Sequence, residues 1–435
     1  MEERESWGSR IGFIMAAIGY SVGMGNLWRF PSMVGQYGGG IFLLFYTLVV
    51  FLIGIPMLSI EISLGKSTRK DPVGAYKTLR PRSLWFLNGY VNVLTNLVIT
   101  GYTAPIAGWV AAYFFKSVSG VFNGMSPAEV ETYYENFISN PLEVILWTLI
   151  LIAGLLFVLH RGVKKGVEKV NKILMPSLLA ILLFLIVRSL FLEGAGKGLA
   201  FYFKPDISKF TVEAALAAVG QAFYSMGIAL SAAHIFGSYM RKQDKIVPNA
   251  IIIGVSDLFV AVLAGFLIFP IVFAFGLNPK AGFGLTFITM PNIFNQLPMG
   301  NLVAGLFFLL FFLAAFTSFL GGTEAIVAHL RDKWKVPRKY GIFIMAGLVL
   351  TIAILAATSA KIFQKVDFLC TNIFLILGAL VMTIFVGRVW PLKKFFETAE
   401  IKSKPARLFW VIIVQYFIPV MLILIWLSQL GIIRK

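Results

Sequence analysis

The sequence predicts an all-α polytopic membrane protein, and three observations support that prediction. Hydrophobic residues make up 58% of the 435 residues and charged residues only 13%, which is about half the charged share of a soluble domain. Apolar stretches long enough to cross the hydrocarbon core recur along the whole chain. A stretch of this length can satisfy its backbone inside lipid only as a helix. The excess of apolar surface is therefore expected to face a lipid bilayer.

Eleven stretches have the length of a spanning helix. They are residues 11–36, 41–64, 86–115, 142–159, 172–192, 213–239, 248–276, 300–330, 340–358, 367–390 and 408–430. Most lysines and arginines lie in segments that share one side of the membrane, namely 4–10, 66–82, 161–172, 241–245, 331–339 and 388–407. The positive-inside rule then predicts a multi-pass protein of the cell membrane, with a cytoplasmic N-terminus and an extracellular C-terminus. Residues 124–143 and 193–211 become outer loops.

The composition excludes several other classes of protein. The net charge of +18 does not indicate nucleic-acid binding, because the cations lie in short loops and not in one basic domain. The single cysteine, Cys370, excludes an intrachain disulfide and a cysteine metal cluster. The sequence contains no paired catalytic groups, so an enzyme is the least favoured class and no cofactor is expected.

Glycines interrupt two of the predicted helices at corresponding places. The first helix contains Gly19, Gly23 and Gly25, and the sixth contains Gly220 and Gly227. The two helices are five spans apart, so the second unit is inverted in the membrane. Broken helices at matching places in inverted halves point to a transport site near the midplane. Close helix packing is the alternative explanation of such glycines.

Polar side chains at membrane depth are costly and are functional candidates by default. The ionisable ones are Arg29, Glu61, Asp257, Glu324 and Asp367. A lone buried carboxylate such as Asp257 requires a cation or a hydrogen-bond donor. Thr317 and Ser318 add hydroxyls, although such hydroxyls often bond back to their own helix. Carboxylates, hydroxyls and freed carbonyls are the ligands of hard cations, so cation coordination is predicted without fixing the ion.

Several motifs together resemble the neurotransmitter:sodium symporter family. They are Trp7-Gly8-Ser9-Arg10, Gly23-Met24-Gly25-Asn26-Leu27-Trp28-Arg29-Phe30-Pro31, Gly38-Gly39-Gly40, Gly54-Ile55-Pro56, Glu61, Gly220-Gln221-Ala222-Phe223, Ile268-Phe269-Pro270, Val272-Phe273, Thr317-Ser318 and Glu324. The resemblance covers nearly the whole chain and is closest to prokaryotic members with eleven helices. It implies an inverted five-helix repeat, with residues 1–210 as the first unit, 211–395 as the second and 396–435 as an additional helix 11.

The resemblance also implies two sodium sites, with sodium as the coupling ion and the only metal. One site would use the carbonyls of Gly19, Val22 and Ala314 and the hydroxyls of Thr317 and Ser318. The other would use the Ser21 carbonyl, Asn26, Ser225, Asp257 and the carboxylate of the substrate.

A small zwitterionic substrate is expected between the two broken helices. By resemblance, its carboxylate would meet the amides of Met24 and Gly25 at the N-terminus of a half-helix, which favours an anion. Its ammonium would meet carbonyls near Ser21, Tyr224, Ser225 and Gly227, with Tyr224 as a cap. The outer gate would be the pair Arg29 and Asp367, and the inner gate the pair Arg4 and Asp332.

Three departures from the family pattern concern the substrate more than the ions. Thr103 stands where the family has a tyrosine that binds the substrate carboxylate, and Tyr102 is one residue away on another face of the helix. The run 225–231 differs from the usual serine and glycine pattern. Gly322 replaces a side chain that is often bulky.

These observations predict a sodium-coupled symporter of amino acids that works by alternating access. Asp257 would supply a fixed negative charge, so transport is expected to be independent of chloride. The alternatives are symport of a taurine-like or betaine-like zwitterion, or a sensor or channel on the same scaffold, although two gate pairs argue against a channel. The sequence gives no indication of the oligomeric state.

Overall fold

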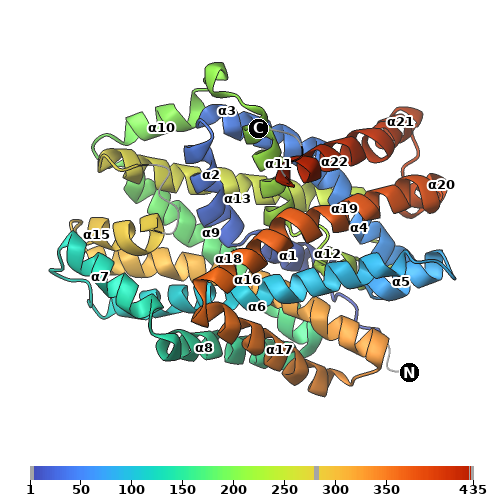
Figure 1. Ribbon diagram of the computed structural model, residues 1–435, viewed down its shortest axis with the longest axis horizontal. Coiled ribbons are helices and arrows are strands. Elements are labelled where there is room, and N and C mark those ends of the chain that lie inside the picture. Colours follow the sequence, from blue (N-terminus) through green and yellow to red (C-terminus); the bar gives the residue numbers. More distant parts are fainter. Residues whose placement is uncertain (1–3, 279–283, 431, 433–435) are drawn as a thin grey trace.

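The computed structural model describes residues 4–278, 284–430 and 432. Within these residues the fold consists of helices, and the β-type pairing is confined to one isolated bridge between Gly39 and Pro205. The long helices run side by side along the longest axis of the molecule (Figure 1). The all-α membrane fold predicted from hydropathy is therefore confirmed.

The helices of the first half are α1 (Arg10–Ser21), α2 (Phe30–Gln36), α3 (Gly40–Val49), α4 (Ile55–Thr68), α5 (Pro72–Leu79), α6 (Phe86–Val118), α7 (Pro127–Ile138), α8 (Pro141–His160), α9 (Lys169–Leu190) and α10 (Ala195–Phe203). Those of the second half are α11 (Val212–Met226), α12 (Ala232–Ser238), α13 (Ile246–Ala274), α15 (Met290–Phe294), α16 (Gly300–Trp334), α17 (Arg338–Thr358), α18 (Ala360–Phe368), α19 (Leu375–Ile384), α20 (Leu392–Thr398), α21 (Lys404–Ile412) and α22 (Ile418–Gln429).

Short π-helical segments join several of these helices end to end. They are η1 (Gly25–Arg29), η2 (Val50–Gly54), η3 (Val163–Glu168), η5 (Leu285–Thr289), η6 (Leu369–Phe374), η7 (Phe385–Val389) and η8 (Ile413–Phe417), and η4 (Ile207–Lys209) is a 3₁₀ turn. Because η2, η6 and η8 continue the helix on both sides, each predicted span that contains one of them remains a single membrane crossing.

The number of unbroken spans is smaller than the eleven predicted. Within the described residues, nine helical stretches are long and apolar enough to cross a membrane, and the bent pair Arg10–Ser21 and Gly25–Gln36 makes a tenth. The remaining predicted span, 213–239, is divided into α11 and α12, and neither half alone has the required length. The eleven predicted segments are thus all helical, but the sixth is broken more completely than a hydropathy profile reveals.

Two of the segments predicted to share one side of the membrane, those that contain α5 and α20, lie at one end of the molecule (Figure 1). The N-terminus lies at the same end as α5 and α20, whereas α7, α10 and α15 lie at the opposite end (Figure 1). The two stretches predicted as outer loops contain the helices α7 and α10. The first of these begins with a capping box, in which Ser126 and Glu129 satisfy each other's backbone amides.

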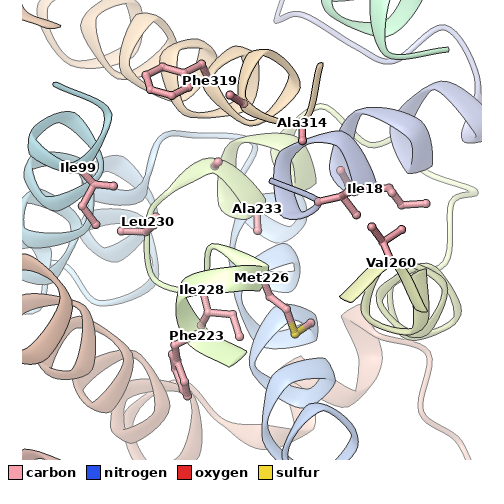
Figure 2. Close-up of a cluster of buried hydrophobic side chains, with 14 of the residues drawn as sticks. Ile18, Ile99, Phe223, Met226, Ile228, Leu230, Ala233, Val260, Ala314 and Phe319 are labelled. Atoms are coloured by element: carbon pink, nitrogen blue, oxygen red, sulfur yellow. The ribbon is translucent and has the colours of Figure 1, made fainter. Parts of the chain in front are cut away.

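The core of the molecule surrounds the two broken helices. The longest helix, α16, packs against α6, α9, α17 and α1, and α12 packs against α4. Apolar side chains from several helices, including Ile18, Ile99, Val260 and Phe319, converge on the gap between α11 and α12 (Figure 2). The breaks are therefore enclosed by protein, as an irregular backbone at membrane depth must be. The division into repeats at residues 210 and 395 remains a prediction.

Candidate functional site

The first helix breaks where its backbone approaches α16 closely. Regular α-helix ends at Ser21, Val22 is extended with φ −77° and ψ +93°, and the chain resumes as helix with a bend of 48°. A Cβ atom on Gly23 would lie 2.4 Å from the Ser318 hydroxyl oxygen. Only glycine allows this approach, which brings the freed backbone of the break beside the hydroxyls of α16.

The sixth helix breaks over residues 227–231, where three residues adopt left-handed backbone conformations. The φ angles are +61° at Gly227, +60° at Ala229 and +66° at Ser231. The Glu61 carboxylate, from α4, accepts a hydrogen bond of 2.9 Å from the amide of Ala229. A Cβ atom on Gly227 would lie 2.3 Å from the ring of Tyr20. The break is thus shaped by a buried acid on one side and by the first broken helix on the other.

The buried Asp257 side chain forms hydrogen bonds with residues beside both breaks. Its carboxylate accepts hydrogen bonds from the Asn26 amide at 2.9 Å and from the Ser225 hydroxyl at 3.1 Å. The Asn26 side-chain oxygen in turn accepts from the amide of Gly23 at 3.0 Å. Gln221 donates to the carbonyl of Gly25 at 2.9 Å. Asn26 and Asp257 are completely buried, so the polar atoms freed by unwinding find their partners among these side chains.

The hydroxyls of α16 lie beside the break of the first helix. Ser318 is 3.4 Å from the carbonyl oxygen of Gly19. Thr317 donates to the carbonyls of Leu313 and Ala314 at 3.0 and 3.1 Å, which is the back-bonding to its own helix expected of an isolated hydroxyl. An acceptor lone pair on each hydroxyl remains for a cation. Val22 and Ala314, which were predicted to complete this site, are also fully buried.

A cavity lies between the two breaks, α6 and α16. Its lining comprises Tyr20, Ser21, Gly23, Met24, Gly25, Asn96, Ile99, Thr100, Thr103, Tyr224, Ser225, Gly227, Leu230, Ala315, Ser318, Phe319 and Gly322. All seven residues predicted to bind substrate are among them, including Thr103. Thr103 thus lies in the wall of the cavity, and Tyr102 is not among the lining residues.

The helix α6 adds a polar wall to this cavity that was not predicted from the sequence. Asn96 donates to the carbonyl of Gly322 at 2.8 Å, and Thr100 lies 3.5 Å from the Asn96 side-chain oxygen. Asn96, Thr100 and Thr103 follow one another at spacings of four and three residues, so they share a face of the helix. That spacing of polar residues in an apolar helix is a signal that could have predicted the wall.

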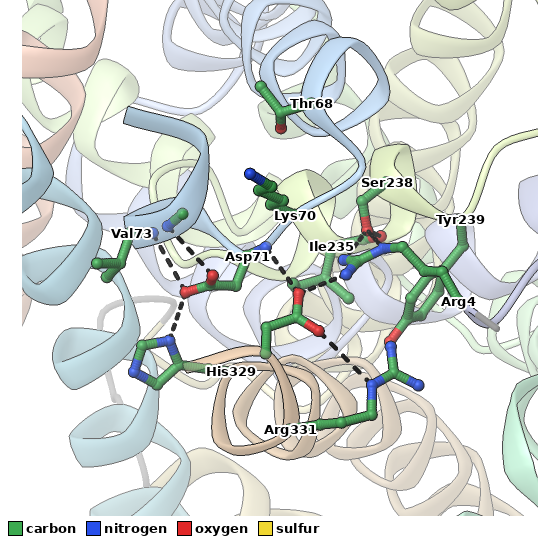
Figure 3. A network of polar contacts seen from close by, with 12 residues as sticks. Arg4, Thr68, Lys70, Asp71, Val73, Ile235, Ser238, Tyr239, His329 and Arg331 are labelled. Carbon is green, nitrogen blue, oxygen red and sulfur yellow. Dashed lines mark hydrogen bonds and ion pairs between the residues drawn. The ribbon is translucent and has the colours of Figure 1, made fainter. Parts of the chain in front are cut away.

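The predicted inner gate pair is formed. Arg4 makes an ion pair with Asp332 and also donates to the Ser238 hydroxyl (Figure 3). The Asp332 carboxylate accepts a further bond of 2.9 Å from the amide of Asp71. Burial alone would raise the pKa of Asp71, but its hydrogen bonds with His329 at 2.7 Å and with the Gly74 amide lower it below its ordinary value. The N-terminal segment, the start of α5 and the end of α16 are therefore connected at this end through charged side chains.

Arg29 and Asp367, which were predicted as the outer gate pair, do not form an ion pair in this structure. Arg29 lies over the ring of Tyr224, 4.4 Å from its centroid, and makes no ion pair within the described chain. The Asp367 carboxylate accepts a bond of 2.7 Å from the Tyr102 hydroxyl instead. Of the two predicted gate pairs, Arg4 and Asp332 are therefore joined, and Arg29 and Asp367 are apart.

Among the described residues, no three histidine, cysteine, aspartate or glutamate side chains gather into a possible metal site. The polar groups around the breaks are backbone carbonyls and amides, hydroxyls, the side-chain amides of Asn26 and Gln221, and the carboxylates of Glu61 and Asp257. Such a set suits a hard cation and not a transition metal.

Comparison with known proteins decides the family. The sequence profile of the sodium:neurotransmitter symporter family matches residues 4–124 and 136–434. The chain belongs to the sodium:neurotransmitter symporter family. The resemblance found in the first-helix motif is therefore confirmed, and this symporter is a multi-pass, sodium-dependent membrane transporter.

Individual relatives agree with this assignment over their full lengths. The symporter is 33% identical to an uncharacterised sodium-dependent transporter of Bacillus subtilis, over 98% of each chain. It is 31% identical to a sodium-dependent transporter of Haemophilus influenzae, over 99% of each. The crystal structure of MhsT in complex with L-phenylalanine has a TM-score of 0.92 and 33% identity, and it covers 98% of this chain and 100% of that one. These relatives are transporters and not enzymes.

The contact between Tyr102 and Asp367 predicts an effect on the outer end of the cavity. Tyr102→Phe removes the hydroxyl that holds the carboxylate, so Asp367 becomes available to Arg29 and the outer end should close more often. We expect several-fold slower modification of a cysteine placed at Ala315 in the cavity, measured with a membrane-impermeant thiol reagent in a Cys370→Ala background. Tyr113→Phe on the same helix is the control, because the Tyr113 hydroxyl has no hydrogen-bond partner. Equal labelling rates in the two variants would contradict this role.

Proposed function

We propose that this symporter couples sodium to the uptake of amino acids through the cavity between its two broken helices. The observation that carries the proposal is that one cavity collects all seven residues predicted to bind a zwitterion, directly beside the Asp257 cluster. A zwitterion needs opposite charges a few ångströms apart. The amides of Met24 and Gly25 begin a half-helix and favour a carboxylate, and the carbonyls freed beside Gly227 favour an ammonium.

Two sodium ions would bind at the breaks. The first proposed site combines the Ser21 carbonyl, Asn26, Ser225 and Asp257 with the carboxylate of the substrate, so the ion and the substrate would stabilise each other. The second combines the carbonyls of Gly19, Val22 and Ala314 with the hydroxyls of Thr317 and Ser318. The 3.4 Å contact between Ser318 and Gly19 supports this second set, because it brings a hydroxyl of α16 beside the carbonyls of the first helix.

The cavity favours an amino acid with a bulky side chain. Ile99, Leu230, Ala315 and Phe319 give its lining an apolar part, and Gly322 adds no side chain to the wall. The related transporter MhsT has been crystallised with L-phenylalanine, which supports the same substrate class here. A taurine-like zwitterion lacks a side chain that could fill this space.

Alternating access would use the two gate pairs in turn. In this structure Arg4 and Asp332 hold the inner end, while Arg29 and Asp367 are apart. We propose that sodium stabilises this arrangement, and that bound substrate allows Arg29 to reach Asp367. Opening of the inner pair would then release substrate and sodium to the cytoplasm.

Transport and binding assays with the purified protein test the proposal. Proteoliposomes should accumulate a radiolabelled amino acid such as phenylalanine only when an inward sodium gradient is imposed. A thermal-shift screen of zwitterions, with and without sodium, identifies the preferred substrate, because a ligand of the folded state raises its apparent stability. Betaine or taurine as the best ligand would overturn the amino-acid assignment. Sodium-dependent binding without uptake would indicate a sensor.

Loss of either hydroxyl of α16, that of Thr317 or that of Ser318, should weaken the activation of transport by sodium. Thr317→Ala and Ser318→Ala each remove one oxygen ligand, so each should raise the sodium concentration for half-maximal uptake by about tenfold. Thr323→Ala is the matched control, because Thr323 is buried on the same helix and bonds back to Phe319 at 2.6 Å. Sodium dependence that stays unchanged in both variants would remove these hydroxyls from the site.

Because Asp257 supplies a negative charge at the proposed sodium site, we expect transport to need no chloride. A carboxylate beside a sodium ion stays ionised, because the cation outweighs the cost of burial, and it balances the charge without an added anion. Uptake by the unmodified protein should be equal in gluconate and chloride buffers. Asp257→Asn should either abolish uptake or make it dependent on chloride. Normal uptake by this variant in gluconate would show that the acid has another role.

We expect the size of the residue at position 322 to limit the size of the amino acid that the cavity accepts. A Cβ atom at this position would lie 3.1 Å from the side-chain oxygens of both Asn96 and Thr100, so Gly322→Leu fills the wall of the cavity. Competition assays should show at least tenfold weaker inhibition by phenylalanine, with little change for alanine. Gly347→Leu is the control, because α17 has open space at Gly347. An equal loss for both amino acids would place the substrate side chain elsewhere.

A further inference from the structure

A second cavity lies where α8 turns into α9, away from the broken helices. Cations make up all but one of its lining residues, which are Arg161, Lys164, Lys165, Glu168, Lys169 and Lys172. We call this cavity, with its six lining residues, the basic cavity. The single acid is already satisfied, because the Glu168 carboxylate accepts from the Gly8 amide at 2.7 Å and pairs with Lys172 at 2.6 Å. The carboxylate therefore neutralises Lys172 and leaves the other cations of the cavity uncompensated.

None of those other four cations forms an ion pair within the part of the chain that the structure describes. Arg161 lies over the ring of Phe157, 4.1 Å from its centroid. The stem of Lys164 lies against Gly8, where an added Cβ would approach its carbon atoms to 2.8 Å. Like charges repel one another, so gathering four of them around one hollow is unfavourable unless an anion enters it.

The local structure explains why these cations converge. The helix α8 ends at His160, Gly162 turns the chain with φ +78°, and η3 begins at once with Val163. The turn places Arg161 near the start of the next helix. Lys165, Lys169 and Lys172 then follow at spacings of four and three residues, which places them along one side of the helix.

The basic cavity borders a surface that faces lipid. Only 39% of the apolar window of α8 is buried inside the protein, and only 33% of that of η3 and α9. Phe157 is 61% exposed and Ile173 is 58% exposed. A molecule that fills the cavity therefore meets cations at the end of the helices and an apolar surface directly beside them. This combination matches a phospholipid, whose phosphate and acyl chains are joined in the same order.

We propose that the basic cavity binds the phosphate group of an anionic phospholipid, with the acyl chains along the exposed faces of α8 and α9. The positive-inside rule accounts for an excess of cations at this end of the molecule, but it does not require unpaired cations around one hollow. A basic pocket between membrane helices is a typical site for an acidic headgroup. Inorganic phosphate shares the charge but gains nothing from the apolar surface, so the lipid is the favoured ligand.

Lipid titration of the purified full chain tests this inference independently of transport. The melting temperature in a neutral detergent is measured against dioctanoyl phosphatidylglycerol, dioctanoyl phosphatidylcholine and inorganic phosphate. The test variant is Lys164→Gln/Lys165→Gln/Lys169→Gln. The matched control is Lys393→Gln/Lys394→Gln/Lys402→Gln, which removes the same charge from exposed lysines at and beside α20. All six lysines are exposed, so both variants should fold, and equal melting temperatures without added lipid check this.

Phosphatidylglycerol should stabilise the unmodified protein and the control variant, whereas the basic-cavity variant should need at least tenfold more of this lipid for the same shift. Phosphatidylcholine and inorganic phosphate should have little effect. Stabilisation by inorganic phosphate at the same concentration would overturn the lipid assignment in favour of a soluble anion. Equal losses in both variants would show that general surface charge, and not the basic cavity, attracts the lipid. Should the triple variant misfold, Lys165→Gln/Lys169→Gln tests the same prediction.

Discussion

A broken helix at membrane depth leaves peptide groups without partners, and lipid offers no water to replace them. In this structure, side chains near the breaks form hydrogen bonds with the freed peptide groups. Glu61 binds the amide of Ala229, Gln221 binds the carbonyl of Gly25, and Asn26 links the amide of Gly23 to Asp257. Each of these contacts joins segments that are distant in the sequence or fixes the geometry of a break. Specific hydrogen bonds therefore fix the geometry of both breaks.

The same contacts explain why substrate and ions would share one place. A break satisfied by polar side chains still presents carbonyl and amide groups toward the space between the helices, because only some of them are used. The cavity occupies this space, between the two breaks and the polar wall of α6. An ion or a zwitterion there completes the hydrogen bonding and charge balance that the protein leaves unfinished. The binding of substrate and of sodium would then be coupled, because both ligands would bind backbone groups of the first helix.

The two predicted gate pairs have different contacts in this structure. Asp332 binds both Arg4 and the amide of Asp71, so the N-terminal segment, the start of α5 and the end of α16 are connected. The Asp367 carboxylate instead accepts a hydrogen bond from a tyrosine of α6. Under the proposed mechanism, closure at Asp367 would require exchange of that partner for Arg29.

The amino-acid sequence by itself determined the membrane-spanning helices, the two breaks and the family, because hydropathy, glycine spacing and local motifs are properties of short segments. The resemblance also predicted Thr103 as a substrate-binding residue, and Thr103 lines the cavity between the breaks. The helix α7, which begins with a capping box at Ser126 and Glu129, lies in a stretch that was predicted only as an outer loop. Only the tertiary structure decided that Asp367 pairs with Tyr102, that Asn96 and Thr100 form a wall, and that four cations gather unpaired around one cavity. The first two features depend on contacts between helices far apart in the sequence. The third depends on packing that brings no further acid of the described chain within ion-pairing distance of the cations.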